Sequence, residues 1–115
     1  MIMLMERKEF KEADGSIGYI ESVFESGNVL KTTYFPQQRR LYIAFSRGHT
    51  YSYGNIGSDL YNEFENNYSQ GIFFHNMINN KKEYPCRKEF TLYPTEVKEL
   101  KEIVENKKLL EEEDE

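Results

Sequence analysis

A strand pattern that runs into a tight turn is the clearest local signal in the chain, and it lies in residues 41–53. Apolar side chains occupy every second position from Leu41 to Phe45, as in a strand with one buried face. The next residues contain Gly48 and supply a turn, and a second strand pattern begins at Thr50. This stretch therefore predicts a β-hairpin, against which the other elements can be placed.

Two more strand patterns come before this hairpin. Residues 17–25 carry apolar side chains on both faces, which is typical of a strand covered on both sides. After a turn at residues 26–28, residues 29–35 are rich in β-branched and aromatic types. Pro36 ends this strand because proline cannot donate to the ladder. Since four strands follow one another through short links, we expect an antiparallel meander.

The spacing of apolar residues becomes helical after residue 57. Residues 58–68 predict a helix capped by Ser58, residues 69–71 predict a stop, and residues 72–78 predict a second, short helix. A third helix is predicted over residues 95–108, with Thr95 as its cap. The apolar stripe of this third helix consists of Val97, Leu100, Ile103 and Val104.

These elements predict one α+β domain over residues 1–110. A four-stranded antiparallel meander sheet packs against two or three helices, and a chain of 115 residues suffices for one modest core. Residues 79–86 read as a polar loop, and a fifth strand over residues 90–93 is left open. Residues 111–115 are all acidic and predict a disordered tail.

Charge is distributed unevenly along the chain, whose formal net charge is −5. Residues 26–88 contain 8 basic and 4 acidic residues, whereas the two flanks together contain 7 basic and 16 acidic residues. Two solvated charge faces would explain this pattern. A basic ligand-binding face, whose range the acidic flanks limit, is the alternative.

Candidate chemistry is sparse. The sequence has no phosphate-binding loop, dinucleotide fingerprint or metalloprotease motif. Its two histidines, His49 and His75, lack other ligands at metal-binding spacing. Cys86 and His75 would form a nucleophilic pair only if the fold brought them together, and a core-edge cysteine with a surface histidine is the simpler interpretation. We therefore expect neither an enzyme, a cofactor nor a metal site.

The cellular location follows from similar considerations. No apolar run approaches the length of a membrane span. The first five residues, MIMLM, lack the charge, apolar region and cleavage site of a signal peptide. Cys86 is the only cysteine, so an intrachain disulfide is excluded. A cytoplasmic protein without membrane contact is the simplest interpretation.

Tyr51 and Tyr53 are the best candidates for a binding role. Two positions apart on a strand, they share one face, as in a stacking platform for bases. A hairpin loop of even length would place them beside Tyr42. A loop of odd length, with Gly48 in the left-handed region, would pair Ile43 with one of them and make both core residues. The candidate ligand-binding residues are Tyr51, Tyr53, Tyr42, Arg40, Arg47 and Lys81.

The same residues carry a resemblance to a known family. Residues 26–88 resemble the KTSC domain, named for its occurrence at the C-terminus of lysyl-tRNA synthetases and also found as a small single domain in bacterial and viral proteins. The family's Y-x-Y motif is matched by Tyr51-Ser52-Tyr53. Its preceding strand and glycine turn match residues 41–48, and its tyrosine-bearing helix matches residues 60–64.

Flanking positions extend this resemblance and also depart from it. The start of the match is Ser26-Gly27-Asn28-Val29, and its end consists of Ser69, Gly71, Phe73, Phe74 and Ile78. His75 stands where the family often has an amide, and His49 replaces a second glycine in the turn. The resemblance implies RNA binding, which has been suggested for the family.

Three functions stay open at this point. The first is a non-enzymatic module that binds a nucleotide or short RNA, for example a small counter-defence protein that sequesters a cyclic-nucleotide signal. A net charge of −5 disfavours long RNA, whose affinity comes from neutralising many phosphates. The second is an inhibitor or adaptor that binds a protein partner through its acidic C-terminal helix. An enzyme is the third. We also expect a weak homodimer formed through exposed aromatic residues, with the helical stripe packed inside the chain.

Overall fold

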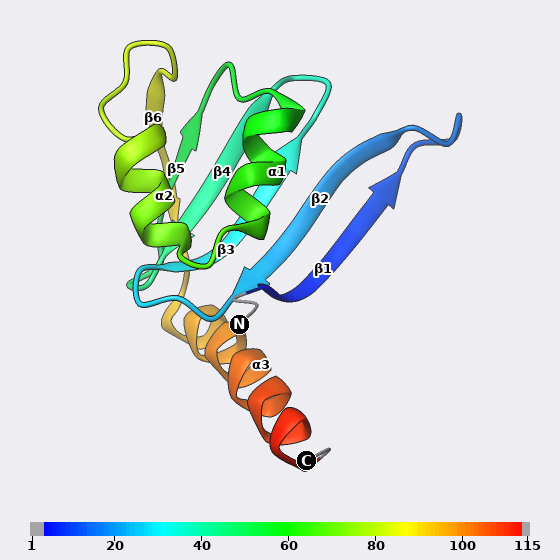
Figure 1. The fold of residues 1–115 in the computed structure, drawn as a ribbon, viewed down its shortest axis with the longest axis vertical. Coiled ribbons are helices and arrows are strands. Elements are labelled where there is room, and N and C mark those ends of the chain that lie inside the picture. Colours follow the sequence, from blue (N-terminus) through cyan, green and yellow to red (C-terminus); the bar gives the residue numbers. More distant parts are fainter. Residues whose placement is uncertain (1–3, 114–115) are drawn as a thin grey trace.

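One antiparallel sheet forms the framework of residues 4–113, which are the residues that this computed structural model describes (Figure 1). The strands of the sheet lie in chain order, so each pairs with the next one along the chain. They are β1 (Leu4–Lys11), β2 (Ile17–Phe24), β3 (Val29–Phe35), β4 (Arg40–Phe45), β5 (His49–Tyr53) and β6 (Cys86–Thr91). The α+β class and the meander are confirmed, with a 6-stranded sheet in place of four or five strands.

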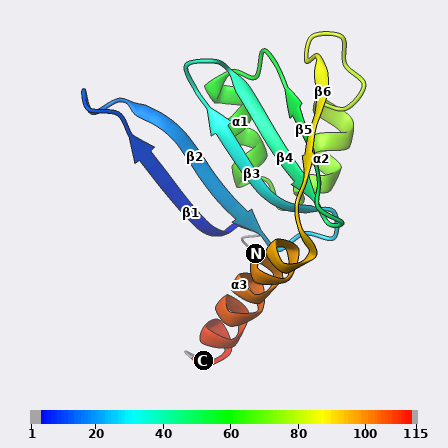
Figure 2. The same cartoon turned by 180° about the vertical axis from the view of Figure 1, so that it is seen from behind.

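The helices divide the sheet into a covered face and an uncovered one. Helices α1 (Ser58–Asn66) and α2 (Gln70–Met77) lie over one face (Figure 1). Figure 2 shows the opposite face, on which most of the length of the described strands has no helix over it. Helix α3 (Pro94–Glu113) follows β6 and extends past the end of the sheet in both views. We call the uncovered side the open face.

The main core lies between the sheet and the helices α1 and α2. The rings of Tyr34 and Tyr61 stack with centroids 4.4 Å apart, and Phe24 meets Phe64 edge to face at 5.6 Å. These side chains alternate along each strand with residues of the open face, as the period of a strand requires. The buried residues of this core are Ile20, Phe24, Val29, Tyr34, Leu41, Ile43, Tyr53, Ile56, Tyr61, Phe64, Phe74 and Ile78.

A buried polar network ties β1 and β2 to α1. The carboxylate of Glu65 is almost fully buried and accepts from Arg7 Nε at 2.7 Å and from Ser22 Oγ at 3.0 Å. The hydroxyl of Tyr61 lies 3.1 Å from Ser22 Oγ and 3.2 Å from Thr32 Oγ1. Because these buried groups are hydrogen-bonded, their burial does not leave an unpaired charge in the core.

The apolar stripe of α3 packs within the chain. Val104 forms a second, smaller core with Met5 of β1 and Val23 of β2, and Leu100 and Ile103 pack against it. Packing of the stripe inside the chain is thus as expected. Several contacts also reach β3, so α3 is anchored at one end of the sheet.

The ends of α3 differ from the prediction. Pro94 is the first helical residue, where its missing N–H costs nothing. Tyr93 therefore occupies the N-cap position, and its backbone N–H donates to the carboxylate of Glu96 at 3.1 Å, so the expected cap at Thr95 is wrong. The helix continues past Lys108 to Glu113, and the last two residues of the predicted tail lie outside the described residues.

The predicted caps and ends of α1 and α2 also need correction. Residues 69–71 do not form a stop, because Ser69 caps α2 and its hydroxyl accepts from the N–H of Ile72 at 3.2 Å. Gly71 lies inside that helix. The N-cap of α1 is Gly57 rather than Ser58, and α1 ends two residues before Tyr68.

Both edge strands depart from the sequence prediction. No strand was expected over residues 4–11, and β6 begins at Cys86, inside the predicted polar loop. Each edge strand is mostly exposed and charged, so neither shows the alternation that marks a half-buried strand. Within residues 4–113, no helix combines the length and apolar character that crossing a membrane would require.

Candidate functional site

The register of the β4–β5 hairpin decides which tyrosines face the core. Ile43 pairs with Tyr51 and Leu41 pairs with Tyr53. Gly48 has a φ of +93° and its N–H donates to the carbonyl of Phe45 at 2.7 Å. This is the odd-length alternative, in which a left-handed glycine closes the turn.

Tyr51 and Tyr53 consequently lie on the helix-covered face. Tyr53 is 4% exposed and its ring meets that of Phe74 at 5.3 Å, while Tyr51 is half-buried against Phe45. Burial raises the pKa of the Tyr53 hydroxyl above its ordinary value. Tyr42 lies on the other face, so the structure has the core alternative for Tyr51 and Tyr53 and not a platform of all three tyrosines.

The open face carries a different set of aromatic side chains. Phe10, Tyr19, Phe35 and Tyr42 come from four adjacent strands and form what we call the aromatic row. The first two rings are stacked at 4.4 Å with an interplanar angle of 12°. Tyr19 and Phe35 are 5.5 Å apart and tilted, and Phe35 and Tyr42 meet edge to face at 5.6 Å and 70°.

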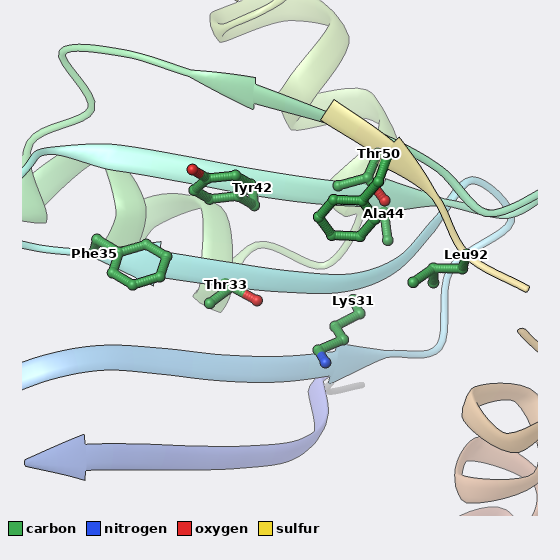
Figure 3. Close-up of a pocket in the computed structure, with 8 residues that line it drawn as sticks. Lys31, Thr33, Phe35, Tyr42, Ala44, Thr50 and Leu92 are labelled. Atoms are coloured by element: carbon green, nitrogen blue, oxygen red, sulfur yellow. The ribbon is translucent and has the colours of Figure 1, made fainter. Parts of the chain in front are cut away.

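One end of the aromatic row borders a pocket with a volume of about 190 Å³. Figure 3 shows side chains of β3 and β4 beneath it, with Phe35 and Tyr42 at one side and Leu92 at the other. The pocket is lined by Lys31, Thr33, Phe35, Tyr42, Ala44, Thr50, Phe90 and Leu92. A planar apolar group fits this lining, and the hydroxyls of Thr33 and Tyr42 and the ammonium group of Lys31 can orient it.

The wall of the pocket is held by the hairpin turn. The backbone N–H of Leu92 donates to the carbonyl of Gly48 at 2.9 Å, which keeps the segment after β6 against the turn. A Cβ at Gly48 would lie 3.1 Å from Val97 Cγ2 and 3.2 Å from the carbonyl oxygen of Leu92. A glycine is thus needed for the turn and for the close approach of α3.

A polar cluster lies beside Tyr42 on the same face. Arg40 Nε donates to Ser52 Oγ at 2.9 Å, and Ser52 Oγ donates to Glu89 Oε1 at 2.6 Å. Arg87 Nε donates to the same carboxylate oxygen at 3.2 Å. The bond from Ser52, and then the charge of Arg87, hold the pKa of the Glu89 carboxyl below its ordinary value. Ser52 pairs with Tyr42 across the strands, so hydrogen-bonding groups adjoin the aromatic pocket.

Lys31 is the one charged side chain among the described residues that line the pocket. Its ammonium group lies 3.3 Å from the carboxylate of Glu21, and both side chains are about one-third exposed.

The sequence interpretation missed Lys31 and Phe35. The signal for both was present, because the alternation of Lys31, Thr33 and Phe35 places them on one face of a strand adjacent to Tyr42.

Only some of the residues predicted for the site lie at or beside the pocket. Tyr42 lines the pocket and Arg40 lies in the neighbouring polar cluster. Arg47 is exposed in the hairpin turn and Lys81 is exposed in the loop before β6, and neither lines the pocket. Whether any of these residues binds a ligand stays a prediction.

Other chemistry-bearing residues lie apart from this pocket. His49 Nδ1 is 3.3 Å from Thr91 Oγ1, His75 is exposed on α2 and Cys86 is exposed on β6. Within the described part of the chain, no group of three or more His, Cys, Asp or Glu side chains could hold a metal ion. The open face thus offers aromatic, cationic and hydroxyl groups, which suit binding.

Comparison with known proteins agrees with this architecture. Residues 25–84 match the family model of the KTSC domain, which is just over half of the chain. The chain is similar to the crystal structure of a KTSC domain protein from Yersinia pestis, with 25% sequence identity and a TM-score of 0.53. That match covers 74% of this chain and 100% of the other. None of the curated proteins matches the chain. The KTSC domain is not a known enzyme family.

Proposed function

We propose, from the premise that this chain belongs to the KTSC domain family, that it is a non-enzymatic binding module whose open face holds a nucleotide ligand. The observation that carries this proposal is the pocket beside Phe35 and Tyr42. An aromatic pair that meets edge to face at 70° leaves a ring face uncovered by its partner. A nucleobase can stack on such a face regardless of its identity.

Polar groups around the pocket fit the other parts of a nucleotide. Thr33 and Tyr42 place hydroxyl groups along the lining, and Lys31 supplies a positive charge. Thr50 instead donates its hydroxyl to the carbonyl of Gly48 at 3.3 Å. Arg40 and Glu89 lie beside Tyr42, where a donor and an acceptor can meet the edge of a base. Such a mixture of apolar surface and few polar groups is typical of small-molecule sites.

The distribution of charge favours a compact ligand. Residues 94–115 contain 9 acidic and 4 basic residues, a net charge of −5, so the remaining 11 acidic and 11 basic residues balance. A neutral body with an acidic helix is poorly suited to long RNA, which requires many phosphate contacts. A nucleotide or a short RNA requires few. The association with lysyl-tRNA synthetases that the resemblance implies is consistent with either ligand.

Sequestration of a cyclic-nucleotide signal is one form that this function could take in a cytoplasmic counter-defence protein. A module of this kind needs a tight site and no catalytic groups, so the pocket alone could serve. Its signature would be strong binding of a cyclic nucleotide that is recovered unchanged after release.

Isothermal titration calorimetry with nucleosides and nucleotides tests the proposal. We expect Tyr42→Ala to weaken binding about fivefold or more, because stacking contributes about 1–3 kcal/mol per base. Tyr42→Phe keeps the ring and should retain most of the affinity. Tyr68→Ala is the matched control, because Tyr68 is 70% exposed and does not line the pocket. Absence of nucleotide binding by the wild-type protein, or equal losses in Tyr42→Ala and Tyr68→Ala, would contradict the proposal.

A second candidate function rests on the free end of α3. Leu109 and Leu110 are 55% and 57% exposed on a helix that extends past the sheet (Figure 1). We propose as the alternative that this acidic helix docks into an apolar, basic-rimmed groove of a partner protein. Purified partner candidates should then bind the wild-type chain more tightly than Leu110→Ser, and binding should weaken as salt is added. Equal binding by both chains would exclude this alternative.

A further inference from the structure

We infer that the open face accommodates a single nucleotide unit and that Lys31 binds its phosphate. This inference rests on the proposed nucleotide-binding function and makes it more specific. Of the two ligands, a free nucleotide and a short RNA, it favours the free nucleotide. It also gives a role to Lys31, which sequence patterns did not indicate.

The aromatic rings in the outer part of the row already stack on each other. Phe10 and Tyr19 are stacked on each other at 4.4 Å with nearly parallel rings, so each covers a face of the other. Tyr19 is followed by Phe35 at 5.5 Å with an angle of 35°. A base could insert between Phe10 and Tyr19 only after these rings had separated. The edge-to-face pair at Tyr42 is therefore the place where the row can receive a base.

The pocket has room for one base. Its volume is about 190 Å³, and it lies between strands β3 to β5 and the residues Phe90 and Leu92. Leu92 is fixed by its hydrogen bond to Gly48, so this wall is part of the folded structure. Figure 3 shows the lining residues gathered around the pocket from β3, β4, β5 and the segment after β6.

Lys31 is placed to bind one phosphate. It lines the same pocket as Tyr42, and its ammonium group supplies three donors on a flexible stem. Its partner Glu21 lies 3.3 Å away, and the two side chains are 31% and 32% exposed. Glu21 takes up one of the three donors of the ammonium group, so donors remain for a phosphate.

Calorimetry with three probes for each base tests the inference: the nucleoside, its 5′-monophosphate and a trinucleotide of the same base. We expect the monophosphate to bind about tenfold more tightly than the nucleoside, because a phosphate forms a charge-assisted hydrogen bond with Lys31. The trinucleotide should bind no more tightly than the monophosphate. Lys31→Met should abolish the advantage of the monophosphate over the nucleoside.

Lys8→Met is the matched control. Lys8 is also a strand lysine with a carboxylate partner, Glu6 at 3.1 Å, and it pairs across the strands with Glu21. It does not line the pocket, so its removal tests the loss of one positive charge from the open face outside the pocket. We expect Lys8→Met to keep the preference for the monophosphate.

The outcomes separate the inference from the function on which it rests. If neither nucleosides nor monophosphates bind the wild-type protein, the proposed function fails and the inference fails with it. If they bind but the phosphate adds no affinity, only the role of Lys31 is overturned. The same conclusion follows if Lys31→Met loses no more affinity for the monophosphate than Lys8→Met does. A trinucleotide that binds about tenfold more tightly than the monophosphate would overturn the limit to one unit.

Discussion

At the scale of single residues, Gly48 has the largest consequences for the site. Its positive φ gives the hairpin an odd loop, which directs Tyr51 and Tyr53 to the core and leaves Tyr42 on the open face. A shift of one residue in this register would exchange the two faces. Sequence alone left both registers open, because it cannot show which residues of the turn adopt the left-handed conformation.

Replacing Gly48 by alanine should destabilise the fold by more than backbone strain alone. Gly15→Ala is the matched control, because Gly15 also has a positive φ, of +89°. A Cβ at Gly15 would have nothing within 4 Å, whereas a Cβ at Gly48 would lie 3.1 Å from Val97 Cγ2. We expect a loss of about 1–2 kcal/mol for Gly15→Ala. Gly48→Ala should lose about 1–3 kcal/mol more through overpacking. Urea unfolding of both variants measures the difference, and equal losses would contradict it.

Tyr53 should behave as a core residue. Tyr53→Ala removes a ring that is 4% exposed, and large aromatic truncations of this kind cost about 3–5 kcal/mol. Tyr68→Ala, at a 70% exposed position, should change the free energy of unfolding by less than about 0.5 kcal/mol. Chemical denaturation compares the two. A Tyr53→Ala variant as stable as Tyr68→Ala would show that the hairpin register is wrong.

At the scale of elements, the interior was predictable and the edges were not. Strands β2 to β5 carry the alternation of buried strands, and all three helices follow helical spacing. The edge strands β1 and β6 bury few side chains and are rich in charge, so they show no such period. Their charges also protect the unpaired edges from association. Tyr42 and Arg40 of the candidate face were selected from sequence. The alternation that places Phe35 and Lys31 on one face was also visible, but the register that sets them opposite Arg40 and Ala44 is not given by local patterns.

Helix α3 should depend on its small core for its position. Val104→Ala removes two methyl groups packed against Met5 and Val23 and should cost about 1–2 kcal/mol. Leu109→Ala is the control, because Leu109 is 55% exposed near the free end of the helix. Hydrogen exchange should show faster exchange of α3 amides in Val104→Ala only. Unchanged protection in that variant would mean that other contacts hold the helix.

At the scale of the whole molecule, a neutral body carries an acidic helix, and the sheet has one covered and one open face (Figures 1 and 2). The apolar stripe of α3 packs inside the chain against Met5 and Val23. Exposed aromatic residues remain for pairing with a second copy, among them Phe90 and Tyr93, which are 54% and 74% exposed.

The weak homodimer therefore stays a prediction about these aromatic residues. Light scattering at two protein concentrations should show an average mass that rises above 13.7 kDa as the concentration increases. Tyr93→Ser should reduce this rise, because it removes exposed aromatic surface. A mass of 13.7 kDa at both concentrations would rule out the dimer.

Mapping of chemical-shift changes by nuclear magnetic resonance tests most directly whether the open face binds a nucleotide. Labelled wild-type protein would be titrated with the nucleoside 5′-monophosphates. The expected changes are saturable and concentrate on the amides of the pocket residues, in particular Lys31, Phe35, Tyr42, Phe90 and Leu92. Saturable changes confined to α1, α2 or the free end of α3, or no changes at all, would contradict nucleotide binding by this face.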